Sequence, residues 1–390
     1  MKRQIIPYAR QEIHQNDIDA VVAVLRSDLL TQGPSIPAFE QAIASSCGAK
    51  HAVAVNSATS ALHMACLALG VGPGDVVWTS PISFVASANC ALYCGAKVDF
   101  VDIDPRTYNL SADCLAEKLA KAKKEGVLPK VVIPVHLCGQ PCDMARIHTL
   151  GREYGFRIIE DASHAIGGKY QGEPIGNCRY SDITVFSFHP VKIITTGEGG
   201  MLMTQQASLD KRLRLLRSHG ISALEEDGQI RPKGEIWNYQ QIDLGFNYRM
   251  TDIQAALGLS QMKRLDEFVA RRHVLAAEYN LRLSKFPVVV PWQHPDSHSS
   301  YHLYVIRLQL DKITKSHRQV YDELFAAGVR VNLHYIPVYR HPYFEKMGFK
   351  SGYCPQAERY YAEAISIPLF PGLSETQQQQ VIQEITSALQ

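Results

Sequence analysis

The sequence predicts an α/β protein with a large domain on a mostly parallel sheet, residues 1–255, and a smaller α+β domain, residues 256–390. First, a chain of 390 residues exceeds the span of one ordinary core. Second, from about Lys50 to Thr204, short runs rich in Val and Ile alternate with helical patterns, which is typical of right-handed crossovers between parallel strands. Third, after about Thr251 long helical patterns dominate.

The large domain is expected to alternate strands and helices along most of its length. We predict strands at residues 51–55, 75–78, 97–101, 130–135, 157–160, 182–187 and 200–204, and helices at 58–69, 83–93, 111–124 and 143–154. Only a loop separates the last two strands, so antiparallel pairing is expected there.

The C-terminal part is expected to be mostly helical. We predict helices at residues 251–265, 266–284 and 316–327, strands at 302–308 and 329–333, and a final helix from Ser374. Thr251 is placed to cap the first of these helices. The segment 221–243 is polar, contains Gly and Pro, and is expected to be a surface loop.

The composition excludes several protein classes. A formal net charge of only +2 argues against a nucleic-acid binder, although it leaves room for a local basic pocket. No apolar run of about 18 residues predicts a membrane span, and the N-terminus lacks a signal-peptide core. The nine cysteines are scattered without zinc spacing, which favours buried thiols over disulfides or a metal. A cytoplasmic enzyme without a metal is the expectation.

A first candidate site is the segment 56–62, where small and hydroxylated residues follow a strand and open a helix. Free amides at a helix N-terminus bind phosphate, and the small residues let the backbone approach an anion. Taken alone, the segment is a weak signal, because an ordinary Ser or Thr helix cap is more common than a phosphate site.

A second candidate is the segment 160–167, which begins with Glu160 and Asp161 at the end of an apolar strand. Ligands collect at this edge of an open α/β sheet, and a carboxylate there could keep a heteroaromatic nitrogen protonated. The alternative is that Asp161 caps the following turn.

A third candidate is Lys192, a single lysine within the apolar segment 187–200, which ends in a glycine-rich turn. Desolvation lowers the pKa of an amine and makes it a usable nucleophile toward a carbonyl. The alternative is a surface lysine beside a hairpin turn, whose charged end reaches water.

Together, the three segments match what pyridoxal 5'-phosphate (PLP) requires. This cofactor acts as an electron sink when its phosphate is fixed, its ring nitrogen stays protonated and an amine holds its aldehyde. A nucleotide-sugar dehydrogenase fits poorly, because no G-x-G-x-x-G follows an early strand.

These segments, with Leu244-Gly-Phe-Asn-Tyr-Arg-Met-Thr-Asp252, resemble the DegT/DnrJ/EryC/StrS nucleotide-sugar aminotransferases, and the resemblance covers nearly the whole chain. It implies a fold-type I PLP-dependent transferase. Residues 6–10, 27–33 and 78–90 look most like the branch that aminates C4 of a UDP-linked 4-keto-6-deoxy-N-acetylhexosamine for pseudaminic acid, with glutamate as donor.

The resemblance also implies roles for individual cofactor-binding residues. Lys192 would form the Schiff base and shuttle the proton, Asp161 would pair with the pyridinium nitrogen, and Phe84 would stack on the ring. The phosphate would be held by Ala58, Thr59 and Ser187, with Asn247 reaching it from the second subunit of a homodimer that shares its active sites. His164 would lie near the phenolic oxygen, where many relatives carry Gln.

Two segments and one tyrosine would contact the sugar nucleotide, again by resemblance: Tyr8; Leu30, Thr31, Gln32 and Gly33; and Asn332, Leu333, His334 and Tyr335. Without the resemblance, Phe84 and the pair His334-Tyr335 could be core residues, and Asn247 could lie in a plain helix-entry turn.

Three functional alternatives stay open. Another nucleotide-linked keto sugar, carrying GDP or dTDP, could be the substrate. A dehydratase branch has His in place of the lysine, so Lys192 speaks against it. A non-catalytic sensor could have kept the PLP fold, and it would need no amino donor.

Overall fold

The structure is a computed structural model that describes residues 5–222, 235 and 237–390. Part of the surface loop predicted at residues 221–243 therefore lies outside the described residues. Two short strands at its ends, β10 (Ile221–Ser222) and β11 (Gln240–Gln241), pair with each other.

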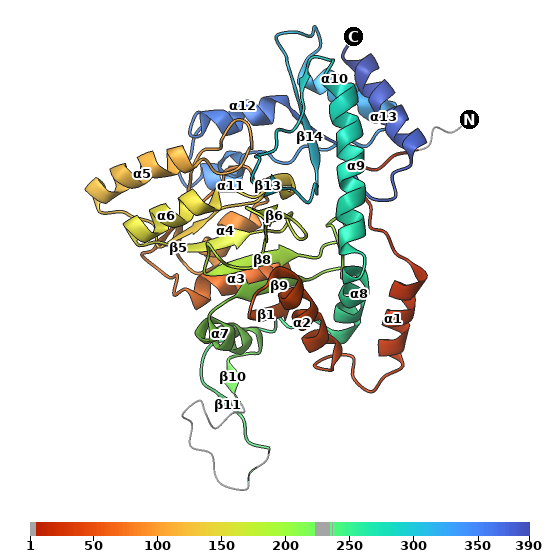
Figure 1. The fold of residues 1–390 in the computed structure, drawn as a ribbon. Coiled ribbons are helices and arrows are strands. Elements are labelled where there is room, and N and C mark those ends of the chain that lie inside the picture. Colours follow the sequence, from red (N-terminus) through yellow and green to blue (C-terminus); the bar gives the residue numbers. More distant parts are fainter. Residues whose placement is uncertain (1–4, 223–234, 236) are drawn as a thin grey trace.

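A seven-stranded sheet in the order β1-β9-β8-β5-β4-β2-β3 forms the centre of the large domain (Figure 1). Its strands are β1 (His51–Val55), β2 (Val76–Thr79), β3 (Lys97–Phe100), β4 (Val131–Ile133), β5 (Arg157–Asp161), β8 (Ile183–Ser187) and β9 (Gly200–Thr204). The run β8-β5-β4-β2-β3 is parallel, whereas β9 is antiparallel to both β8 and β1. The predicted mostly parallel sheet with antiparallel pairing at its end is confirmed.

Helices cover both faces of this sheet because its strands are apolar on both sides. Val53 and Val55 on β1 pack in one core with α3, α4 and α7, and Ala52 and Ala54 pack in a second core with α2, α5 and α6. The helices are α2 (Ser35–Cys47), α3 (Ala58–Ala68), α4 (Ala86–Tyr93), α5 (Ala112–Glu125), α6 (Met144–Tyr154) and α7 (Ala207–Arg217).

A third core lies in the C-terminal part, where helices pack against the antiparallel sheet β12-β14-β15 and against Ile6. The long helix α9 runs alongside both parts of the molecule (Figure 1). The elements here are α8 (Asp252–Met262), α9 (Leu265–Leu283), β12 (Val288–Val289), β14 (Tyr304–Leu308), α10 (His317–Ala326), α11 (Pro342–Glu345), α12 (Pro355–Glu363), β15 (Ala364–Ile367) and α13 (Glu375–Ala388).

The remaining elements are short or peripheral. They are α1 (Gln15–Leu25), the 3-10 turns η1 (Leu137–Gly139) and η3 (Val338–Arg340), and a small sheet of β6 (Lys169–Tyr170), β7 (Glu173–Pro174) and β13 (Ser297–His298). The predicted boundary between residues 255 and 256 falls inside α8, and the division into two domains stays a prediction.

The strand predicted at residues 329–333 is wrong. The segment forms only isolated bridges, Ile6 with Val329 and Asn332 with Ser366. A local hydrogen bond from the Val331 amide to the Val329 carbonyl, 3.0 Å long, turns the backbone between the two bridges. The segment therefore pairs with two different partners, and no continuous ladder can form.

Candidate active site

Lys192 lies in the loop between β8 and β9, where its amide donates to the His189 carbonyl at 2.9 Å. Its side chain is partly buried, and no hydrogen bond or ion pair of Nζ occurs among the described residues. Desolvation lowers the pKa of the amine to about 8, opposed by the nearby charge of Asp161. This desolvation favours the buried amine over a surface lysine whose charged end reaches water.

Asp161 ends β5 beside β8, and its carboxylate is buried. Oδ2 accepts a 2.6 Å hydrogen bond from Ser87, and Oδ1 accepts one of 2.6 Å from the Ser163 hydroxyl and one of 3.1 Å from the Ser163 amide. The last of these bonds is the turn cap considered as an alternative, and the pairing of Asp161 with a ring nitrogen stays a prediction. Because its charge acts on Lys192, the two side chains share one region of the protein.

The segment predicted to bind the phosphate lies where α3 begins. Ser57 caps the helix by accepting a 3.1 Å hydrogen bond from the Ser60 amide. The amides of Ala58 and Thr59 belong to the first turn and have no partner inside the helix. Gly200, the register partner of Ser187, lies so close that a Cβ on it would be 2.7 Å from the backbone of Ser57 and Ala58. Ser187 and the start of α3 are therefore neighbours.

Phe84 precedes α4 and is 59% exposed, so it is not a core residue. Its ring centroid lies 6.4 Å from that of Tyr335. An exposed phenyl ring at this position offers a flat apolar face to an aromatic ligand.

His164 is buried, and burial lowers its pKa well below the usual value, helped by Lys192 and His334. Its Nδ1 accepts from the Cys138 amide at 3.3 Å, and its Nε2 lies 3.3 Å from the Tyr335 hydroxyl. His164, predicted to contact the cofactor, and Tyr335, predicted to contact the sugar, are thus joined by a hydrogen bond.

The residues predicted to contact the sugar form a polar cluster beside these groups. The Tyr8 and His334 rings lie 5.3 Å apart, and His334 Nδ1 is 2.8 Å from the Ser366 hydroxyl. The Asn332 side chain lies 3.4 Å from His334 Nε2 and accepts from the Leu333 amide at 2.8 Å. His334 therefore has polar partners although it is buried.

Two predicted regions lie elsewhere within this chain. The segment Leu30–Gly33 is attached to α8: the Asp252 amide donates to the Leu30 carbonyl at 2.9 Å, and the Gly33 amide donates to the Asp252 carboxylate at 2.7 Å. Asn247 is exposed and bridges Ser218. No interaction among the described residues joins either region to Lys192 or Asp161.

Sequence reasoning missed four residues that shape the site. Ser83 and Ser87, four apart near the start of α4, form a 2.6 Å hydroxyl chain to Asp161, and their spacing was the only available signal. The His302 ring lies against that of His164, with centroids 4.3 Å apart and ring planes tilted by 48°, and its buried Nδ1 has no partner in the described structure. Neither His302 nor Cys138 carries a local sequence signal.

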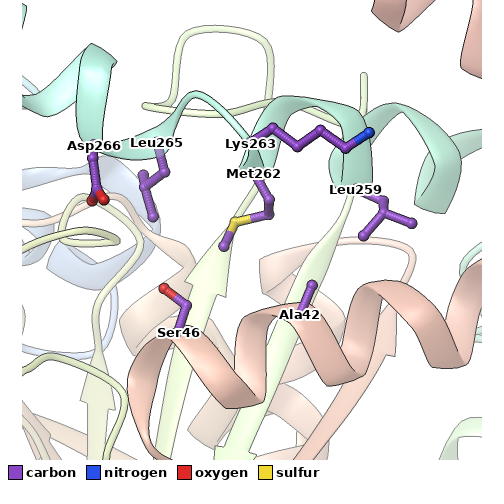
Figure 2. A pocket seen from close by; sticks show the side chains of 7 residues that line it. All are labelled: Ala42, Ser46, Leu259, Met262, Lys263, Leu265 and Asp266. Carbon is purple, nitrogen blue, oxygen red and sulfur yellow. The ribbon is translucent and has the colours of Figure 1, made fainter.

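A separate hollow lies outside the candidate site. Figure 2 shows it between α2 and the junction of α8 with α9, with a volume of about 280 Å³. Its lining contains none of the predicted site residues: Ala42, Ser46, Leu259, Met262, Lys263, Leu265 and Asp266. The described residues contain no helix long and apolar enough to cross a bilayer, and no group of three or more side chains placed to hold a metal.

The residues around Lys192 fit pyridoxal 5'-phosphate. Each part of the cofactor has a possible partner here. The amine of Lys192, with its lowered pKa, suits the aldehyde, and the buried carboxylate of Asp161 suits the ring nitrogen. The free amides at the start of α3 beside Ser187 suit the phosphate, and the exposed ring of Phe84 suits the ring face. The buried Nδ1 of His302, which has no partner among the described residues, could form a further hydrogen bond to a ligand at this site.

Comparisons with known proteins agree with this geometry. Residues 11–386 match the model of the DegT/DnrJ/EryC1/StrS aminotransferase family. The spore coat polysaccharide biosynthesis protein SpsC of Bacillus subtilis is 37% identical, over 98% of this chain and 97% of its own. A UDP-4-amino-4,6-dideoxy-N-acetyl-β-L-altrosamine transaminase of Campylobacter jejuni is 36% identical, over 93% and 92%.

Comparison of the fold with solved structures identifies the same family. Helicobacter pylori PseC, an aminotransferase involved in the biosynthesis of pseudaminic acid, superposes with a TM-score of 0.88 at 29% identity, over 99% of both chains. Related sugar aminotransferases have been solved in a PLP form, so the predicted fold class and cofactor are confirmed. The chain belongs to the DegT/DnrJ/EryC1/StrS family of PLP-dependent sugar aminotransferases.

Proposed function

We propose that this enzyme transfers an amino group from glutamate to C4 of a UDP-linked 4-keto-6-deoxy-N-acetylhexosamine. The observation that carries the proposal is the full-length similarity to the Campylobacter jejuni transaminase, which is named for this type of product, joined with an intact Lys192 and Asp161 pair. The enzyme would act in the cytoplasm, where nucleotide sugars are made.

Lys192 supplies the reactive amine. With a pKa of about 8, roughly a quarter of the amines are neutral at pH 7.5, against about one in a thousand for an ordinary lysine. A neutral amine can attack a carbonyl carbon, and Nζ can afterwards take up a proton and return it at the reacting carbon.

The other side chains hold the cofactor in register. When bound, PLP supplies an electron sink for the carbon that carries the transferred nitrogen. Asp161, kept in one orientation by Ser87 and Ser163, would hold the ring nitrogen protonated through a charge-assisted hydrogen bond. Phe84 would cover one ring face, and the start of α3 with Ser187 would bind the phosphate.

The sugar nucleotide would lie over the cluster of Tyr8, Asn332, Leu333, His334 and Tyr335. Because no interaction within the described part of the chain joins Leu30–Gly33 or Asn247 to this cluster, we propose that they complete the site across a homodimer. The exposed position of Asn247 supports this arrangement, in which it would reach the partner's cofactor phosphate.

A second candidate is the amination of a different nucleotide-linked keto sugar. SpsC, at 37% identity, is named for spore coat polysaccharide biosynthesis and not for pseudaminic acid. The relatives therefore support more than one sugar product.

Product mass separates the two candidates. The purified enzyme is incubated with glutamate and with UDP-, GDP- and dTDP-linked keto sugars, and we expect an amino sugar only from the UDP-linked 4-keto substrate. Lys192→Ala should abolish both turnover and the borohydride-reducible cofactor adduct, whereas Lys263→Ala, an exposed lysine of the hollow in Figure 2, should leave both intact. Amination of another sugar, or a Lys192→Ala enzyme that still transaminates, would contradict the proposal.

A further inference from the structure

The backbone around His164 holds its ring in one position. Ser300 Oγ donates to the His164 carbonyl at 2.7 Å, and the Ser300 amide donates to the Gly139 carbonyl at 3.1 Å. Gly139 lies so close that a Cβ on it would be 2.9 Å from the same His164 carbonyl. Cys138, with a φ of 60°, directs its amide at His164 Nδ1. The loop after β4 is therefore shaped around this histidine.

These contacts determine where the proton of His164 lies. A backbone amide can only donate, so the Cys138 amide requires Nδ1 to be unprotonated. Burial, with Lys192 and His334 nearby, keeps the pKa low and the ring neutral, so its one proton is on Nε2. Nε2 must then donate to the Tyr335 oxygen, 3.3 Å away.

The direction of this hydrogen bond leaves the Tyr335 hydroxyl proton free. Desolvation raises the pKa of Tyr335, so the hydroxyl stays protonated at neutral pH. Tyr335 has no second hydrogen bond among the described residues, and its neighbours include Phe84 and Asp161. The site thus presents one oriented O–H donor without an acceptor.

The cofactor's own geometry says which oxygen would meet this donor. In PLP the phosphate arm and the phenolic oxygen flank the aldehyde carbon on opposite sides of the ring. Along the sheet edge, the start of α3 lies beside Gly200 on β9 and Ser187 on β8, Asp161 ends the next strand, β5, and Cys138 follows β4. If the start of α3 held the phosphate and Asp161 held the ring nitrogen, the phenolic oxygen would lie on the side of the site where His164 and Tyr335 are.

We propose that Tyr335 donates its hydroxyl proton to the phenolic oxygen of bound PLP, and that His164 is a positioning residue that acts through Tyr335. His164 cannot serve the phenolic oxygen itself without giving up the Tyr335 bond, because it has only one ring proton. The inference rests on Lys192 as the cofactor lysine, but not on the identity of the sugar.

Tyr335→Phe tests the donor directly in the holoenzyme. A donor stabilises the anionic oxygen and weakens the chromophore as a base, so its loss should raise the pH midpoint of the visible absorbance change by about one unit. The dissociation constant for PLP, titrated into the apoenzyme, should rise about tenfold. Tyr279→Phe is a matched control, because it removes a buried hydroxyl bonded to the Pro368 carbonyl, and it should change neither value. An unchanged midpoint in Tyr335→Phe overturns the proposal.

A double-mutant cycle tests the role of His164. His164→Leu should shift the midpoint in the same direction as Tyr335→Phe, and the double variant should shift it no further. His164→Gln should keep the wild-type midpoint, because an amide can accept from the Cys138 amide and donate to Tyr335 at once. Additive shifts would show that His164 acts on the cofactor independently and would refute the positioning role. Because no sugar is used, failure here is separate from failure of the proposed substrate.

Discussion

Replacing Lys192 with methionine should make the apoprotein more stable near neutral pH. The lysine has a pKa of about 8 in the folded chain against an ordinary value of 10.5, a difference that corresponds to roughly 3 kcal/mol. Because the side chain is only partly buried, we expect about 2 kcal/mol of this to be measurable. Methionine has a similar length and no charge, so it removes the penalty with little change in packing.

The pH dependence gives the prediction its sign. Well below pH 8 the lysine is protonated in both the folded and the unfolded chain, and the folded chain bears the full desolvation penalty. Between pH 8 and 10.5 the unfolded chain binds more protons, so the stability of the wild type rises with pH. The advantage of Lys192→Met should therefore be greatest at pH 7 and vanish by about pH 10.5.

Urea denaturation of the two apoproteins at pH 7, 9 and 10.5, at one protein concentration, measures this difference. Lys121→Met is the control, because that lysine side chain is 77% exposed and should show no such pH-dependent gain. A methionine variant no more stable than the wild type at pH 7, or one whose advantage does not fall with rising pH, would refute the assignment of Lys192 as a desolvated amine.

Two further changes probe the start of α3 and the ion pair between Asp17 of α1 and Arg264. Gly200→Ala would bring a methyl group to 2.7 Å from the Ser57 backbone, so the start of α3 must shift. Titration of PLP into the apoenzyme should then show an affinity reduced at least tenfold. An unchanged affinity would show that the start of α3 does not bind the phosphate. Arg264→Met leaves the fully buried Asp17 carboxylate without its cation, and urea denaturation should show a free energy of unfolding lower by about 3 kcal/mol. Adding Asp17→Asn to this variant should restore part of the lost stability. If it restores none, the ion pair does not stabilise the fold as described.

The helix predictions were most accurate where a capping residue precedes the helix. Several predicted helices begin behind a side chain that accepts from the third residue of the helix: Ser57, Ser111, Asp143, Thr251, Ser316 and Ser374. Three helices that were not predicted follow residues outside the usual caps: α1 after His14, α2 after Pro34 and α7 after Gln206. Tertiary packing of their apolar faces stabilises these helices, and a local signal for that packing is weak.

The candidate site was predictable to the extent that it follows strand ends. Asp161 ends β5 and Ser187 ends β8, and adjacent parallel strands bring such residues to one edge. Cys138, Ser300 and His302 come from loops whose backbone paths are set only by the folded chain. No spacing in the sequence reveals that they surround His164, and so the hydrogen bond that frees the Tyr335 proton could not be foreseen.

The ionisable side chains around Lys192 share one electrostatic environment. Burial lowers the pKa of Lys192, His164, His302 and His334, and the charge of Lys192 lowers the pKa of all three histidines further, so the four groups share one desolvated region. A positive charge on any of these groups is costly in the empty chain, and an anionic guest would lower that cost. A phosphate-bearing cofactor and a diphosphate-linked sugar are both anionic. The same desolvation that lowers the stability of the apoprotein keeps the Lys192 amine reactive at neutral pH.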